Sequence, residues 1–147
     1  MAVTATPIFA QAPLIGVADM SAVTACTTRG PTATAGLAAA NIFQLLTTTT
    51  NGARVDKIRV KASSTSFTAA TAAATVTIWI WDGTTAYPFD EILITALTPS
   101  TTVASYSAET NYTTLQLPST YKLYCSTSVT TTAATTAFVV EAFGGAY

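Results

Sequence analysis

The stretch Val76-Thr-Ile-Trp-Ile-Trp-Asp-Gly-Thr-Thr-Ala-Tyr-Pro-Phe-Asp-Glu-Ile-Leu-Ile-Thr95 is expected to decide the fold, because it has the pattern of one β-hairpin around the turn signal Asp82-Gly83. Side chains alternate faces along a strand, so Trp79 and Trp81 lie opposite the isoleucines. A half-exposed antiparallel strand is apolar on one face only, but this strand is apolar on both. Its outer face therefore needs a cover, from another part of the chain or from another subunit.

Other short strand patterns surround this hairpin, and they are separated by turn signals such as Asn51-Gly52 and Pro118. The Ala/Ser/Thr-rich residues 63–74 are expected to form a loop. Turn signals every ~8–12 residues, with no helix of normal length, are typical of an antiparallel sandwich. We therefore predict an all-β, antiparallel, jelly-roll-like β-sandwich. The other expected strands are residues 41–46, 54–62, 102–108, 112–117, 121–127 and 136–143.

The beginning of the chain differs from the rest. Residues 1–36 contain several prolines and glycines between short apolar pieces, which predicts an extended N-terminal arm, whereas residues 37–147 are expected to form the β-sandwich domain. The arm carries too many apolar side chains to stay in water. It should lie along its own domain or along a neighbouring chain. The apolar residues concerned are Ile8, Phe9, Leu14, Ile15 and Val17.

The composition favours an assembling protein. Hydrophobic residues make up 50% and charged residues only 9% of the 147 residues, against a typical ~25% charged. Thr supplies about a fifth of the chain, so the expected surface is made of hydroxyl and methyl groups, which protect poorly against association. No apolar run approaches the ~20 residues of a membrane helix, and the start lacks the pattern of a signal peptide. We therefore expect no membrane partner.

The charges also exclude some partners. The net charge is −1, which does not indicate a nucleic-acid-binding surface. Four of the six basic residues nevertheless cluster, as Arg54, Lys57, Arg59 and Lys61, and the last three share one face of the expected strand 54–62. That face is either a solvated outer surface or a basic stripe that meets an acidic partner.

Catalytic patterns are scarce. The chain has no histidine, so it cannot build a Ser-His-Asp triad or a Cys-His pair, and its two cysteines, Cys26 and Cys125, cannot fill a zinc site. We expect these two to be free, buried thiols that pack as small hydrophobes. The one adjacent acidic pair, Asp90-Glu91, should point to opposite faces, although a glycosidase dyad from distant strands stays open. We expect no enzyme, no metal and no cofactor.

The hairpin aromatics allow two interpretations. Trp79, Trp81, Tyr87 and Phe89 could line one face and stack on sugar rings, as in a carbohydrate-binding sandwich. Alternatively, the tryptophans fill the core or a subunit contact, where they bury a large area.

Several pieces of the chain resemble small virion structural proteins of tailed bacteriophages. These pieces are residues 6–16 (Thr-Pro-Ile-Phe-Ala-Gln-Ala-Pro-Leu-Ile-Gly), residues 51–60 (Asn-Gly-Ala-Arg-Val-Asp-Lys-Ile-Arg-Val), the Trp-Asp-Gly of residues 81–83, residues 115–123 (Leu-Gln-Leu-Pro-Ser-Thr-Tyr-Lys-Leu) and the ending 138–147. They follow one another in the order found in that family. The long Ala/Thr stretches and the two cysteines depart from its pattern.

The resemblance implies a head decoration or cement protein, a homotrimeric β-sandwich that stabilises the capsid by bridging subunits of the major capsid protein. It implies a place on the capsid surface, reached by assembly in the host cytoplasm; a tail or neck position, and a carbohydrate-binding module, remain alternatives. The partner interface is then expected to include Ile8, Phe9, Leu14, Ile15, Val17, Trp79, Trp81, Arg59 and Lys61.

Overall fold

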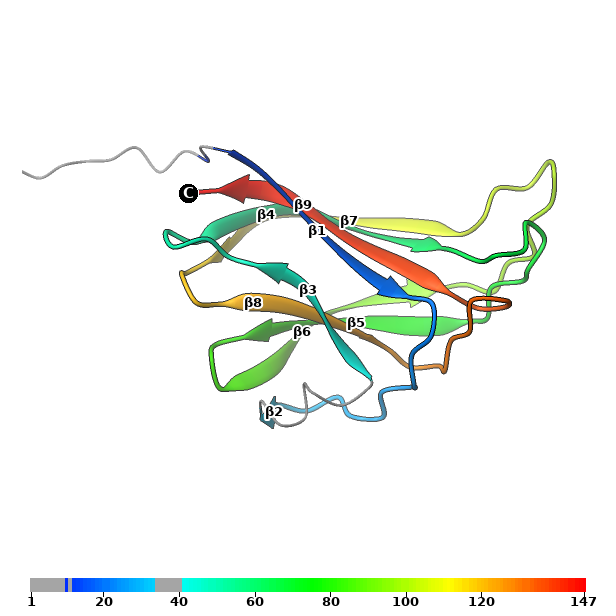
Figure 1. The fold of residues 1–147 in the computed structure, drawn as a ribbon, viewed down its shortest axis with the longest axis horizontal. Coiled ribbons are helices and arrows are strands. Elements are labelled where there is room, and N and C mark those ends of the chain that lie inside the picture. The colour runs from blue at the N-terminus through cyan, green and yellow to red at the C-terminus, as the bar shows by residue number, and fades with distance from the viewer. Residues whose placement is uncertain (1–9, 11, 34–40) are drawn as a thin grey trace, which may run out of the picture.

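Two antiparallel β-sheets pack face to face in the computed structural model, which describes residues 10, 12–33 and 41–147 (Figure 1). The first sheet has the strand order β1-β9-β4-β7, and the second has the order β2-β6-β5-β8-β3. The described residues contain no helix. The strands are β1 (Ala12–Met20), β2 (Thr32–Ala33), β3 (Ile42–Thr47), β4 (Ala53–Ala62), β5 (Ala74–Trp81), β6 (Thr85–Ile94), β7 (Ser107–Leu117), β8 (Lys122–Thr127) and β9 (Phe138–Ala146).

The strand pairing is that of a jelly roll. Leaving out the two-residue β2, the first strand pairs with the last (β1 with β9), the second with the second-last (β3 with β8), and the inner ones likewise (β4 with β7, β5 with β6). This nesting arises when one long antiparallel ribbon wraps into two sheets. The predicted all-β, jelly-roll-like sandwich is confirmed.

The core lies between the two sheets and follows the period-two pattern of the strands. On β4, Ile58 and Val60 are fully buried, while the basic side chains alternate with them on the outside. On β5, Val76 and Ile78 face the same core from the opposite sheet. Phe138, at the start of β9, is among the largest buried side chains. The faces expected for strand 54–62 are therefore confirmed.

The turns and strand ends mostly agree with their signals. Gly52 and Gly83 have φ values of 96° and 109°, which L side chains rarely adopt, and both stand at the predicted turns. The ladder between β5 and β6 is irregular at Pro88, as expected for a proline in a strand. The two strands expected at 102–108 and 112–117 are wrong: residues 107–117 form the single strand β7. Backbone hydrogen bonds between Ser100 and Val103 make a turn just before it.

Residues 12–20 of the expected arm form β1, an edge strand of the first sheet. It pairs with β9 along its whole length, from Ala12 opposite Ala146 to Met20 opposite Phe138. Gly16 brings β1 against β3, because a Cβ there would lie 2.2 Å from the backbone oxygen of Leu45. One open side of the sandwich is closed in this way. Ile8 and Phe9 lie outside the described residues.

Aromatic side chains close the opposite side, between β6 and β7. The rings of Phe89 and Tyr112 lie 5.6 Å apart between centroids, and the Tyr112 hydroxyl donates a 2.6 Å hydrogen bond to Asp90. Burial, together with this hydrogen bond, raises the pKa of Tyr112 well above its ordinary value. The neighbouring Glu91 points the other way and pairs with Arg29 at 3.2 Å, so the predicted opposite faces of Asp90 and Glu91 are confirmed.

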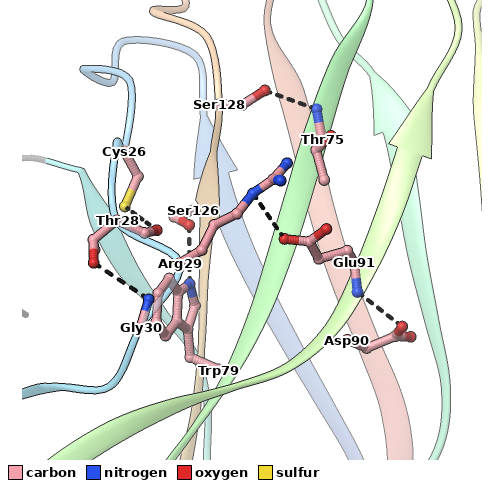
Figure 2. Close-up of polar contacts among 10 residues, drawn as sticks. All are labelled: Cys26, Thr28, Arg29, Gly30, Thr75, Trp79, Asp90, Glu91, Ser126 and Ser128. Carbon is pink, nitrogen blue, oxygen red and sulfur yellow. Dashed lines mark hydrogen bonds and ion pairs between the residues drawn. The ribbon is translucent and has the colours of Figure 1, made fainter.

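The outer face of the second sheet is covered by the chain itself. After β1, residues 21–31 cross this face toward β2, which pairs with β6. The Cys26 amide bonds the carbonyl of Thr127 at 2.8 Å, and Arg29 reaches across to Glu91 on β6. Figure 2 shows Cys26, Thr28, Arg29 and Gly30 lying over the strands that carry Trp79 and Ser126. The cover that the two-faced strand required is therefore intramolecular at this position.

Candidate interaction surface

The outer face of the first sheet carries exposed apolar side chains beside charged ones. On β1, the inward side chains are buried or half-buried, whereas Ile15 and Val17 are 63% and 57% exposed. The register places Ile15 opposite Phe143 and Val17 opposite Glu141 on β9. We call the strip formed by Ile15, Val17 and Phe143 the apolar edge strip.

A charged band lies beside the apolar edge strip. The register continues from Phe143 to Lys57 on β4 and from Glu141 to Arg59. The Arg59 Nε donates to Glu141 at 2.6 Å, and the Lys57 ammonium lies 3.2 Å from Glu109 on β7. The hydrogen bond that Arg59 donates to Glu141 raises the pKa of Arg59 above its ordinary value, so this side chain stays charged. The band is thus a set of cross-strand ion pairs rather than an unbalanced basic stripe.

Two cations also cover the aromatic ring in this face. The Lys57 ammonium lies 5.3 Å and the Arg59 guanidinium 5.5 Å from the centroid of Phe143. These distances suit cation–π attraction. The band therefore holds Phe143 in place and keeps it half-buried, while Ile15 and Val17 stay open beside it.

Lys61 differs from its neighbours on β4. It is exposed, and no ion pair joins it to the residues that the structure describes. It stands at the end of the strand, next to the long loops, opposite Val139 on β9. Of the three basic residues on this face, it is the one left to attract an anionic group from outside.

The residues expected at the interface are separated by the fold. Ile15, Val17, Arg59 and Lys61 come together on the outer face of the first sheet. Leu14 points inward and packs partly against the core. The alternation of side-chain faces along residues 12–20 therefore distinguishes the outward Ile15 and Val17 from the inward Leu14.

Trp79 is fully buried within its own chain. It packs with Ile42 and Ala86, its indole N–H donates to the Ser126 hydroxyl at 2.9 Å, and Cys26 lies against this cluster (Figure 2). It therefore presents no surface to a partner. The sequence left open whether the chain or a subunit would cover it.

Trp81 is half-buried at the end of β5. It makes an edge-to-face contact with Tyr124, at 6.2 Å between centroids, and the Lys122 ammonium lies 5.0 Å from its ring. Tyr87 and Phe89 are 46% and 42% exposed, and Phe89 packs toward β7. The four hairpin aromatics therefore do not form one flat row for a sugar ring.

A second open feature lies at one end of the sandwich. The loops before β5, before β7 and before β9 meet there (Figure 1, right), and they enclose a cleft of about 830 Å³. We call it the end cleft. Its lining comes from residues within the ranges 62–71, 99–105 and 135–141. Arg59 and Lys61 line its border with the first sheet. No local signal pointed to it, because its walls are far apart in the sequence.

Metal-ligand clusters and disulfides are absent among the residues that the structure describes. No three acidic or cysteine side chains among them gather as metal ligands. Cys26 and Cys125 are both free, as predicted, but only Cys125 is buried, so the expected burial is wrong for the half-buried Cys26. Complete burial raises the pKa of the Cys125 thiol. The described part of the chain also holds no helix that could span a membrane.

Comparisons with known proteins found no match: no protein-family model, no curated protein and no solved structure corresponds to the chain.

Proposed function

We propose that this chain is a non-enzymatic structural protein that docks on a protein shell, as head decoration or cement proteins of tailed phages do. The observation that carries the proposal is the outer face of the first sheet, where Ile15 and Val17 stand exposed on an edge strand beside a band of ion pairs. An apolar strip rimmed by polar groups is the usual form of a protein-binding surface. Self-association as a trimer, with no cofactor, belongs to the same proposal.

The edge strand adds a second means of attachment. β1 is the last strand of its sheet, and an edge strand can pair with a strand from another chain. Such pairing provides backbone hydrogen bonds, while the side chains of the apolar edge strip provide apolar contact. The partner surface should therefore offer an extended segment with apolar residues.

The size of this face sets the strength of a single contact. A nine-residue strand spans about 30 Å, and four strands at about 4.8 Å spacing span about 14 Å, which gives roughly 400 Å². A standard interface buries about 800 Å² per partner. One copy alone should therefore bind modestly, and a trimer on a repetitive shell would gain by multivalency.

A carbohydrate role based on the hairpin aromatics has less support. Trp79 is buried and Trp81 is half-buried against Tyr124. A sugar platform needs open rings on one face, and this pair does not supply it.

The first test is to look for the chain on virus particles. Tailed particles purified from the source culture should contain the chain by mass spectrometry, and immunogold should label their heads. Labelling of tails or necks would replace the head position, and absence from particles would overturn the proposal.

The second test removes the apolar edge strip. In Ile15→Thr/Val17→Thr, both positions stay β-branched, so the strand is retained. Because about 60% of each residue is exposed, the double variant should lose about 2–3 kcal/mol of contact with the shell, which is about 30- to 150-fold in affinity. Phe67→Ser, which changes another exposed apolar residue in the end cleft, is the matched control and should bind shells normally.

A further inference from the structure

The end cleft is a preformed depression rather than a gap between loose loops. The Ser63 amide bonds the carbonyl of Ala137 at 2.8 Å, and the Thr65 amide bonds that of Ala133 at 2.8 Å, so the loop before β5 is tied to the loop before β9. Thr71 exchanges backbone hydrogen bonds with Leu97 at 2.7 and 3.1 Å. The three walls are therefore fixed to one another before any ligand arrives.

The lining of the cleft has an unusual chemistry. Nine of its twenty lining residues are Ser or Thr, and it contains a single aromatic residue, Phe67. Its volume of about 830 Å³ lies within the usual range of small-molecule sites, roughly 300–1,000 Å³. Such a wall offers many hydroxyl donors and acceptors beside small apolar groups, a mixture that suits the polar and apolar faces of a sugar ring.

Phe67 lies outside the hydrophobic core. Its side chain is 73% exposed, the most exposed large hydrophobic residue that the structure describes, although its loop is tied down on both sides. Val103, 43% exposed, lies in the loop before β7 that also lines the cleft. An open aromatic face on a fixed loop can stack on the apolar face of a ring in a ligand.

The charges of the cleft favour a negative ligand. Its single carboxylate, Glu141, is held by Arg59 at 2.6 Å. Lys61 lies in the same lining, is exposed, and has no ion pair among the described residues. The cleft therefore presents one uncompensated positive charge beside its hydroxyl groups.

From this combination we infer that the end cleft is a carbohydrate-binding site that takes acidic oligosaccharides. Sugar hydroxyls exchange hydrogen bonds with the Ser and Thr side chains, one sugar ring stacks on Phe67, and a sugar carboxylate pairs with Lys61. A nucleic acid would need several phosphate contacts, for which a single unpaired cation does not suffice. A peptide would be anchored by large side chains in apolar pockets, whereas this lining has one large apolar side chain, Phe67, and nine Ser or Thr residues.

The inference does not depend on the shell-docking proposal, because the apolar side chains that each surface needs are different, although Arg59, Lys61 and Glu141 lie at the border of both. Phe67 belongs to the cleft and Ile15 to the far part of β1, near the end that pairs with the C-terminal part of β9. A change at Phe67 is the control in the shell-binding test, and a change at Ile15 is the control in the sugar-binding test. Failure of one binding activity therefore leaves the other measurable.

The test is a titration of the whole chain with oligogalacturonate, and with a neutral maltooligosaccharide of the same length, by calorimetry and backbone amide NMR. We expect binding of the acidic sugar at millimolar or tighter affinity, with amide shifts confined to residues 62–71, 99–105 and 135–141. Phe67→Ala should weaken binding roughly tenfold. Lys61→Gln should remove the preference for the acidic sugar, and Ile15→Thr should change nothing.

Three results would overturn the inference. They are no binding of either sugar at millimolar concentration, amide shifts outside the cleft, and unchanged affinity in Phe67→Ala. Equal affinity of the unchanged chain for both sugars would refute the role of Lys61. Because Phe67 and Lys61 are both exposed, the variants should fold like the unchanged chain, which thermal unfolding can verify.

Discussion

Replacing Trp79 tests whether the chain covers its own second sheet in solution. The indole is completely buried, packs with Ile42 and Ala86, and lies beneath the crossing segment that contains Cys26. Trp79→Ala should therefore leave a large cavity. Substitutions of this kind cost about 3–5 kcal/mol, a large part of the about 5–15 kcal/mol that stabilises a typical domain.

A milder substitution separates packing from hydrogen bonding. Trp79→Phe keeps a ring in the site but removes the N–H that donates to the Ser126 hydroxyl at 2.9 Å. Ser126 is itself buried, with 1% of its surface exposed. Leaving a buried hydroxyl without its donor costs about 1–3 kcal/mol. If Trp79→Ala does not fold, this variant still gives a measurable loss of stability.

The assay is urea denaturation followed by far-ultraviolet circular dichroism, with Phe67→Ala as the exposed control, which should change stability by less than about 0.5 kcal/mol. In Trp81→Phe, the fluorescence of the remaining tryptophan should be resistant to acrylamide quenching. A cost below about 1 kcal/mol for Trp79→Ala, or ready quenching, would show that the crossing segment does not cover this face. The cover would then have to come from another subunit.

Three further predictions follow from other contacts. Gly16→Ala should cost about 1–3 kcal/mol of stability in thermal unfolding, because its Cβ would meet the backbone oxygen of Leu45 at 2.2 Å. The control Gly30→Ala, whose Cβ would have no atom within 4 Å, should cost far less. Equal losses of stability in the two variants would contradict the close contact between β1 and β3. Cys125 is fully buried and its thiol has a raised pKa, so it should react with a thiol reagent only after the protein unfolds. Modification of Cys125 in the folded protein would contradict its burial. In an alkaline absorbance titration, Tyr112 should keep its proton when the exposed tyrosines ionise. Because its pKa is raised in the folded state, the stability that it contributes is fully present below its ordinary pKa of about 10 and is lost as the pH rises from there toward the folded-state pKa. Ionisation of Tyr112 together with the exposed tyrosines would refute this.

Local patterns were sufficient where neighbouring residues determine the structure. Alternation identified the buried Ile58 and Val60 on β4, and the turn residues Gly52 and Gly83 stand where the backbone has positive φ. The jelly-roll class was also predictable, since many short strands and few charges leave few other architectures. These features depend on contacts close in sequence or on overall composition.

Long-range contacts account for what the sequence could not predict. The cover over Trp79 comes from residues 21–31, about fifty positions earlier, and only the strand pairing brings them together. The end cleft has the same origin, because hydrogen bonds such as that between Ser63 and Ala137 join loops from distant parts of the chain. No window of the sequence contains either arrangement.

The pairing of β1 with β9 also fixes where additional polypeptide would leave the molecule. Ala12 stands opposite Ala146, whereas Met20 and Phe138 meet at the other end, beside the cleft. Anything fused after Tyr147 would project from the end remote from Phe67. A protein fused to the C-terminal end of β9 would therefore leave the loops of the end cleft free. Because Ala12 and Ala146 are paired, a short linker between β9 and β1 would suit a circular permutant.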